Sequence, residues 1–480
     1  MLYRSTRGAS PAVSSAEAVL RGIAPDGGLY LPEALPAFDA RACLKMDTIS
    51  MASALLSALL PDIPDMAELT SRAYCGKFET EDLTPTVPVG NAHVLELFRG
   101  PTSAFKDVAL CMLPQLLTAA KARLGVEKET LILTATSGDT GKAALEGFRD
   151  VPGIRICVFY PDGGVSQVQR AQMVTQEGGN VTVCAVRGNF DDAQTGVKNI
   201  FSVCADRTLP WQLSSANSIN IGRLAPQLTY YFAAYRDLLA RGAIRMGDPV
   251  NFSVPTGNFG DILAGYLAKQ LGLPVGRLLC ASNANNVLTD FISTGVYDRR
   301  RPLHKTQSPS MDILVSSNLE RLLYHVTGSD AEVAGLMKSL AETGSYTVRP
   351  ETLAAIQASF SCGWSSEEEV AGEIRARYEK DNYLCDTHTA VAFHVATQKK
   401  REGVPMVVLS TASPFKFPRS VLTALGQSAP ENDFEAMQQL EAATAHTAPA
   451  SLAALRQKPE RFSTVIEPAQ IAEVALGYQE

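Results

Sequence analysis

The sequence predicts an α/β protein built on parallel sheets, and two observations support this. Between about residues 93 and 330, short apolar runs of strand length alternate with helical runs. This alternation is typical of parallel strands whose connections are covering helices. The chain has 480 residues, which is more than one hydrophobic core usually serves, so we expect two or three domains.

The elements can be justified in order along the chain. Residues 1–36 are expected to be irregular except for a short helix at 16–20, and an Ala- and Leu-rich helix at 47–60 should end at Pro61. The proline-rich stretch 84–88 is expected to be an extended connector. Apolar runs then predict strands at 93–97, 129–136, 155–160, 180–186, 250–255 and 405–410, and helices at 106–113, 142–148, 224–235 and 261–268.

These elements suggest a division of the chain into five ranges. The prediction is an N-terminal segment at 1–92 that packs on a large domain, a small α/β domain at 93–200, the first part of a large α/β domain at 201–304, a mostly helical insertion at 305–400, and the completion of the large domain with C-terminal helices at 401–480.

Composition excludes several classes of protein. The net charge of −7 argues against a nucleic-acid-binding protein. No apolar run is long enough to span a bilayer, and the N-terminus lacks the apolar stretch of a signal peptide. The nine cysteines are odd in number and contain no C-x-x-C pair, and the six histidines are not at ligand spacing. We therefore expect reduced thiols, a cytoplasmic protein and no metal site.

Lys106 stands at the start of an apolar helical run, after the turn 100–103 and small residues. Partial burial there would lower the pKa of its amine and favour the neutral form, which attacks carbonyl groups. A lysine that extends its amine to solvent from a helix start is the alternative, and these residues alone leave both open.

Two loops share the order of strand, glycine-rich turn and helix start. They are Ser137–Gly141 and Thr256–Gly260. Converging backbone N–H groups and the positive end of a helix make both loops candidate anion sites. Each could equally be a capped turn without a ligand. Neither has the spacing of a Walker A loop, and the chain has no G-x-G-x-x-G motif.

Two further polar stretches are candidates for binding. Hydroxyls and amides crowd residues 214–220, and Arg223 follows them, a combination that suits phosphate. The alternative is a polar loop that enters a helix. Thr411 follows a predicted strand, where its neutral hydroxyl could meet a ring nitrogen, or simply form a turn before Pro414.

In their order along the chain, these motifs resemble the threonine synthase family. The resemblance runs from residue 3 to about 420, favours the longer, microbial and fungal-type branch of the family, and rests on residues 3–8, 24–30, 100–107, 134–141, 217–220, 257–261, 311–313, 317–323 and 411–416.

The resemblance implies the fold type II of pyridoxal-phosphate enzymes, with two parallel-sheet domains that enclose the cofactor. Lys106 would be the lysine that binds the cofactor as a Schiff base. Residues of the second loop would hold its phosphate, with Thr411 at the pyridine nitrogen; the implied cofactor residues are Lys106, Thr256, Gly257, Asn258, Phe259, Gly260, Asp261 and Thr411. The implied substrate residues are Ser137, Gly138, Asp139, Thr140, Asn217, Ser218 and Arg223.

The implied reaction is the conversion of O-phospho-L-homoserine and water to L-threonine and phosphate. Lys106 would act as the base, phosphate would leave Cγ near Arg223, and water would add at Cβ. Many relatives carry asparagine at the position of Asp139, so the contact of Asp139 with the ring hydroxyl is left open. The stretch 386–390 matches a family segment, but no role is assigned to it.

Other functions remain open at this point. A phospholyase of the same family would release 2-oxobutyrate, and a non-catalytic relative would only bind cofactor or anions. A plain dehydratase would leave Arg223 without an anion to hold. A monomer or homodimer is expected.

Overall fold

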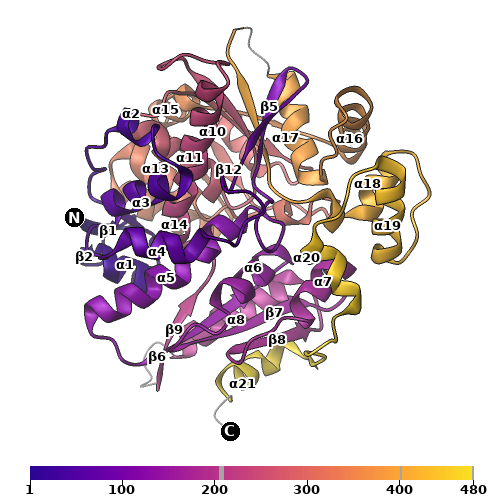
Figure 1. Cartoon of the computed structure of the whole chain (residues 1–480). Coiled ribbons are helices and arrows are strands. Elements are labelled where there is room, and N and C mark those ends of the chain that lie inside the picture. The colour runs from indigo at the N-terminus through magenta and orange to yellow at the C-terminus, as the bar shows by residue number, and fades with distance from the viewer. Residues whose placement is uncertain (205–209, 400–402, 478–480) are drawn as a thin grey trace.

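The computed structural model describes residues 1–204, 210–399 and 403–477. Its framework is two separate sheets, one of six strands and one of five. Figure 1 shows the five-stranded sheet in the lower half of the molecule, the N-terminal elements on the left, and the C-terminal helices α18 Pro418–Ala424 and α19 Asp433–Thr444 on the right. The expectation of two parallel-sheet α/β units is confirmed.

The five-stranded sheet is parallel throughout, in the order β16-β8-β7-β6-β9. Alternate residues of β6 and β7 enter two different hydrophobic clusters, so helices cover both faces. Helix α6 packs on one side, and α8 with α21 on the other. The elements are β6 Glu129–Ala135, α6 Asp139–Phe148, β7 Ile154–Pro161, α7 Gln167–Val174, β8 Val181–Val186, α8 Phe190–Cys204, β9 Trp211–Ser215, β16 Val465–Ile466 and α21 Ile471–Leu476.

The six-stranded sheet has the order β14-β11-β10-β15-β5-β4, and only the pair of β4 and β5 is antiparallel. Helices α10 and α11 lie over one face and α17 over the other. The strands are β4 Thr86–Val89, β5 Ala92–Glu96, β10 Val250–Pro255, β11 Val275–Ser282, β14 Phe360–Trp364 and β15 Met406–Ser410. The helices are α9 Ile221–Leu224, η1 Ala225–Gln227, α10 Leu228–Ala240, α11 Gly260–Gln270, α12 Val287–Thr294, η2 Pro309–Met311, α13 Leu319–Thr327, α14 Asp330–Thr343, α15 Pro350–Ser359, α16 Glu367–Asp381 and α17 Thr387–Gln398; the short ribbon is β12 Val296–Asp298 with β13 Ser345–Thr347.

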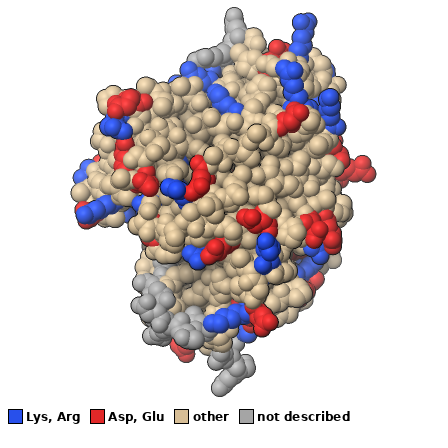
Figure 2. All heavy atoms as spheres, turned by 90° about the vertical axis from the view of Figure 1, so that its left-hand side faces the viewer, with Lys and Arg blue, Asp and Glu red and all other residues tan. Residues whose placement is uncertain are grey.

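The N-terminal segment forms a small antiparallel sheet of three strands, followed by helices. The elements are β1 Leu2–Ser5, β2 Val13–Ser14, α1 Ser15–Arg21, β3 Tyr30–Pro32, α2 Ala40–Cys43, α3 Thr48–Leu59 and α4 Met66–Tyr74. The predicted helix at 47–60 is confirmed, and the side chain of Asp47 caps its start. On the face in Figure 2, which is the left-hand side of Figure 1, Lys and Arg lie interspersed with Asp and Glu.

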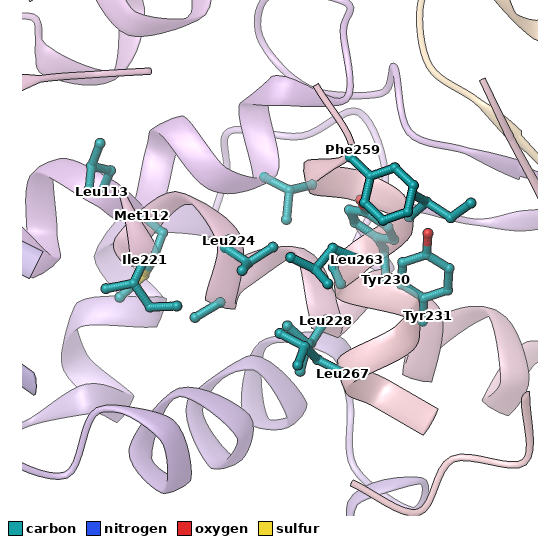
Figure 3. Packing of buried hydrophobic residues seen from close by; sticks show 14 of the residues in the cluster. Met112, Leu113, Ile221, Leu224, Leu228, Tyr230, Tyr231, Phe259, Leu263 and Leu267 are labelled. Carbon is teal, nitrogen blue, oxygen red and sulfur yellow. The ribbon is translucent and has the colours of Figure 1, made fainter. Parts of the chain in front are cut away.

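Helix α5, Lys106–Leu124, connects the parts of the molecule because it packs against α1, α4, α6 and α9. Figure 3 shows how its Met112 and Leu113 meet Ile221 of α9, and how the same core continues through α10 to Leu263 of α11. The helix that begins at Lys106 and the helix that follows the second glycine loop therefore share one hydrophobic core.

The C-terminal part of the chain runs along both sheets. Helix α19 packs against α18 and α7, and β16 then joins the edge of the five-stranded sheet. The elements are η3 Pro414–Lys416, α18 Pro418–Ala424, α19 Asp433–Thr444, α20 Ala450–Ala453, η4 Ala454–Gln457 and η5 Pro468–Gln470.

Three expectations need correction. Residues 1–36 hold the expected short helix, which is α1, and also three short strands that were not predicted. The stretch 84–88 is not a plain connector, because its second half belongs to strand β4. The predicted helix at 224–235 is a short helix, one 3-10 turn and then α10.

Each of the two large sheets also contains strands from more than one of the predicted ranges. Strand β5, placed in the range 93–200, pairs with β15 of the six-stranded sheet, and β9, placed in 201–304, pairs with β6. The range 305–400 is mostly helical, but β14 and α17 are part of the six-stranded layer. The ranges 201–304, 305–400 and 401–480 each include residues outside the described ones, and the division into domains stays a prediction.

Candidate active site

Lys106 opens helix α5 at a place that backbone hydrogen bonds fix. The N–H of Phe105 donates to the carbonyl oxygen of Thr411 at 2.8 Å, and the N–H of Ser413 donates to that of Ser103 at 3.1 Å. Ser103 has a left-handed φ of 57°. The turn before Lys106 is thus joined to the residues that follow strand β15, so the start of helix α5 lies beside Thr411.

The amine of Lys106 is enclosed, with a residue exposure of 8%. Its Nζ lies 4.5 Å from the centre of the Phe105 ring and 4.0 Å from Oδ2 of Asp139. Burial lowers the pKa of Lys106 to about 8; Asp139 and Asp261 oppose this shift, whereas Arg223 and Lys416 favour it. An amine with this pKa is partly neutral near neutral pH, as a nucleophile or base requires.

Asp139 is a buried carboxylate between two lysines. Its Oδ1 lies 2.7 Å from Nζ of Lys416 and accepts a hydrogen bond from Nε2 of Gln169 at 2.8 Å. Burial would raise the pKa of Asp139, but Lys416 and Lys106 outweigh it and hold that pKa well below its usual range. Asp139 was expected to line the substrate carboxylate, and in the structure its side chain faces the amine of Lys106.

The first glycine loop, 137–140, is tightly folded over Thr136. The hydroxyl of Thr136 accepts the N–H groups of Gly138 and Gly141 at 3.0 and 2.8 Å. Gly138 has a φ of 132°, and a Cβ on it would lie 2.5 Å from the Gln169 side chain. Only glycine suits this position, while Ser137 and Thr140 remain half-buried at the loop surface.

The second glycine loop, Thr256–Gly260, is a candidate anion cradle. Within the described residues, no hydrogen bond is donated by the backbone N–H groups of Gly257, Asn258 or Phe259. Phe259 is buried with a left-handed φ of 64° directly before helix α11. These donors at a helix start match the requirements of a phosphate.

Residues 316–318, which lead into helix α13, fix the backbone of the cradle by hydrogen bonds. The hydroxyl of Ser316 donates to the carbonyl oxygen of Gly257 at 2.5 Å, and the N–H of Asn318 donates to that of Asn258 at 3.1 Å. At the helix start, burial raises the pKa of Asp261 to about 6, although the Ile262 N–H binds its carboxylate.

Arg223 is a buried guanidinium, 3% exposed, that uses little of its donor capacity. Its Nη1 donates to the carbonyl oxygen of Ala216 at 2.7 Å, but its Nε has no partner among the described residues, and no carboxylate there pairs with it. Burial lowers the pKa of Arg223 to about 10. Such a group suits an anion that arrives with the substrate.

The loop of Asn217 and Ser218 lies beside the cradle. The side-chain amide of Asn318 donates to the carbonyl oxygen of Ser218 at 3.2 Å, and a Cβ on Gly260 would lie 3.3 Å from the same amide. The structure therefore brings the predicted residues of 217–223 next to those of 256–261.

Sequence reasoning assigned no role to the residues that brace these loops. Arg321 is fully buried and donates to the carbonyl oxygens of Ile219 and Tyr30 at 2.6 and 3.1 Å. Its neighbour Glu320 binds Thr6 and Arg7 of the N-terminal segment. The family motif at 317–323 was the available signal, but it did not reveal this bracing.

The segment 386–390, which had no predicted role, contains a buried pair. His388 Nδ1 lies 2.6 Å from Oδ2 of Asp386, and His388 Nε2 accepts the N–H of Ser310 at 3.2 Å. The carbonyl oxygen of Ser310 lies 2.8 Å from the place of a Cβ on Gly257. The pair therefore supports the turn on which the cradle rests.

Other features of the molecule do not enter the site. A groove of about 800 Å³ lies beside edge strand β14, and no predicted site residue lines it. Within the described residues, no cluster of His, Cys, Asp and Glu could hold a metal ion. None of the described helices is long and apolar enough to cross a membrane.

Three family models match: the threonine synthase N terminus at residues 2–74, pyridoxal-phosphate dependent enzyme at 84–370, and the threonine synthase C-terminal model at 389–475. A threonine synthase from Pseudomonas aeruginosa is 40% identical over 443 residues, which cover 89% of this chain and 91% of the relative.

Two solved structures are similar over nearly the whole chain. The first is a PLP-bound threonine synthase from Brucella melitensis, with a TM-score of 0.88, 40% identity and coverage of 99% of both chains. The second is a threonine synthase from yeast, with a TM-score of 0.88, 33% identity and coverage of 99% of this chain and 98% of the other.

Proposed function

We propose the function from one premise: this chain belongs to the threonine synthase family, and so is a pyridoxal-phosphate-dependent enzyme of threonine biosynthesis. The proposed reaction converts O-phospho-L-homoserine and water to L-threonine and phosphate. In bond terms, the C–O bond at Cγ breaks and phosphate leaves, the hydroxyl of a water molecule adds at Cβ, and protons return to Cγ, which becomes the methyl group of threonine, and to Cα.

The residues of the site fit this cofactor. Pyridoxal phosphate supplies an aldehyde for an amine and a ring that withdraws electrons from the substrate carbon. Lys106 offers an amine with a lowered pKa, and Gly257, Asn258 and Phe259 offer backbone N–H groups that other described residues leave unused. Thr411 is proposed to meet the ring nitrogen, and Thr256, Gly260 and Asp261 to complete the cofactor side.

Lys106 is proposed to be the base. Its Nζ would take the proton from Cα of the substrate, release it, and then take one from Cβ, and each of these two transfers requires the neutral amine. Burial and the positive charges of Arg223 and Lys416 favour that neutral form. Once Nζ carries the proton, Asp139 stabilises the positive charge from 4.0 Å away.

Arg223 is proposed to hold the phosphate of the substrate, with Asn217 and Ser218. A phosphate on Cγ gains charge as its bond breaks, and a buried guanidinium stabilises that charge more than one in water would. Ser137, Gly138 and Thr140 would bind the substrate carboxylate at the start of helix α6. Two separate anion sites are needed because cofactor and substrate each carry a phosphate.

One observation carries this proposal. A buried lysine of lowered pKa stands near two unsatisfied groups of anion donors, the N–H groups of 257–259 and the guanidinium of Arg223. A dehydratase whose substrate carries no phosphate would need only the first of these anion sites.

The proposal is tested by the products. The purified protein with pyridoxal phosphate and O-phosphohomoserine should release threonine and phosphate in equal amounts. Release of 2-oxobutyrate in place of threonine would identify a phospholyase. Cofactor binding without phosphate release would identify a non-catalytic relative.

The proposed setting is the cytoplasm, as a monomer or homodimer. All nine cysteines are free in the structure, as in a reducing compartment. Solution scattering or sedimentation of the purified chain would decide between the two oligomeric states.

A further inference from the structure

Lys416 is built into the site but contacts neither the substrate nor the cofactor in the reaction proposed above. Its side chain is fully buried, at 0% exposure. Its Nζ lies 2.7 Å from Oδ1 of Asp139 and donates to the carbonyl oxygen of Thr102 at 3.2 Å. A buried ammonium is costly unless it is paired, so this arrangement needs an explanation.

Both partners of Lys416 also contact the surroundings of Lys106. The other oxygen of Asp139 lies 4.0 Å from the amine of Lys106. Thr102 binds Asp107, the residue after Lys106, through its N–H at 2.9 Å and its hydroxyl at 2.6 Å. Lys416 therefore holds both the carboxylate that faces Lys106 and the turn that leads into its helix.

Two lysines share one carboxylate unequally. Asp139 is in direct contact with Lys416 but not with Lys106, because the distances are 2.7 and 4.0 Å. Without Lys416, the nearest cation to this buried carboxylate would be Lys106, whose proton it would then hold. We propose that Lys416 is a positioning residue, which keeps Asp139 in its own ion pair and so leaves the amine of Lys106 able to release its proton.

The charged groups that face Lys106 come from four elements: Asp139 on α6, Arg223 on α9, Asp261 on α11 and Lys416 on η3. Asp139 and Asp261 favour the charged amine, and Arg223 and Lys416 favour the neutral one. Loss of Lys416 removes a positive charge and also frees Asp139. Both changes raise the pKa of Lys106, so they do not cancel.

This inference rests on the proposed function, because only a base or nucleophile needs a neutral amine. Its test, however, needs neither cofactor nor substrate. The full chain is labelled competitively with acetic anhydride over a range of pH values, and the acetylation of Lys106 is followed by peptide mass spectrometry. The midpoint of that labelling reports the ionisation of this one amine.

Lys416→Met should raise the midpoint by about 1 pH unit, the size expected when a close carboxylate becomes available. In the Asp139→Asn background, Lys416→Met should raise the midpoint by less, because Lys416 acts on Lys106 largely through the carboxylate of Asp139. Lys142→Met is the matched control. It removes a lysine of helix α6 that pairs with Glu146 at 3.1 Å, and it should leave the midpoint unchanged.

Two more variants keep the test decisive. Lys416→Arg retains the charge and should keep the midpoint close to that of the wild type. Lys416→Gln retains a donor toward Asp139 and Thr102 without the charge, so it replaces Lys416→Met if that variant does not fold, and it should also raise the midpoint.

An unchanged midpoint in a folded Lys416→Met or Lys416→Gln variant would overturn the inference. An equal shift of the midpoint in the wild-type and Asp139→Asn backgrounds would also overturn it, since Lys416 would then act on Lys106 only by direct charge repulsion. If the Lys416 variants shift the labelling midpoint of Lys106 as expected but the product assay fails, the result counts against the proposed reaction. It does not count against the positioning role of Lys416.

Discussion

The carbonyl oxygen of Thr411 accepts the backbone N–H of Phe105 at 2.8 Å, which ties the residue before Lys106 to the end of strand β15. A second bond, from the N–H of Ser413 to the carbonyl oxygen of Ser103, closes the same junction at 3.1 Å. The proposed cofactor lysine and the proposed partner of the ring nitrogen are thus fixed relative to each other by the backbone.

Ser103 should be sensitive to substitution because of its left-handed φ of 57°. A β-branched residue is strained in this region, whereas glycine is not. Ser103→Val is expected to lower the free energy of unfolding by about 1–2 kcal/mol and to weaken cofactor binding. Ser103→Gly should keep both within error of the wild type. Urea unfolding and cofactor titration check this, and a Ser103→Val variant of wild-type stability would contradict it.

Gly260→Asp should weaken cofactor binding far more than Thr140→Val. The new side chain begins 3.3 Å from Asn318 Nδ2 and places a carboxylate beside the proposed phosphate. Juxtaposed like charges cost several kcal/mol, so the dissociation constant should rise by about a hundredfold or more. Thr140→Val should instead impair substrate use. Equal losses of cofactor affinity in the two variants would refute this division of roles.

Arg223→Leu should lower kcat/KM for O-phosphohomoserine by about two orders of magnitude or more. Charge-assisted hydrogen bonds to the leaving phosphate are lost, while the cofactor phosphate is held by another loop. Cofactor affinity should therefore hardly change, and Arg223→Lys should recover only part of the activity, since an ammonium lacks the planar fork. Near-normal activity of Arg223→Leu with bound cofactor would mean that another residue holds the phosphate, with Lys416 and Lys142 the next to test.

The rate at which the protein binds pyridoxal phosphate covalently should rise with pH. The pKa of Lys106 is lowered to about 8 by burial, and only the neutral amine attacks an aldehyde. The rate of covalent attachment of pyridoxal phosphate should therefore rise about tenfold per pH unit below this pKa and level off above it. Stopped-flow absorbance measures this rate. A rate that keeps rising to the pKa of an ordinary lysine would contradict the lowered value.

Much of the framework was predictable because it depends on local patterns. In the sequence, strands β6, β7, β8, β10 and β15 are apolar runs between turn residues. This pattern is typical of buried parallel strands. The two glycine loops and Lys106 were recognisable because strand, turn and helix start are adjacent in sequence.

The rest depends on contacts between distant segments. Strand β16 has two residues and pairs with β8 far earlier in the chain, so no local pattern marks it. The pairing of Lys416 with Asp139 exists only once η3 is brought to the start of α6. Likewise, His388 supports the cradle only through Ser310, which a single sequence does not reveal.

The central claim is that Lys106 is the cofactor lysine of this site. The most direct measurement is borohydride reduction of the protein with bound pyridoxal phosphate, followed by proteolysis and mass spectrometry. The account predicts one pyridoxyl group per chain, on the peptide that contains Lys106, and none on Lys106→Ala protein. A pyridoxyl group on Lys142, Lys416 or any other lysine of the wild-type chain would contradict it.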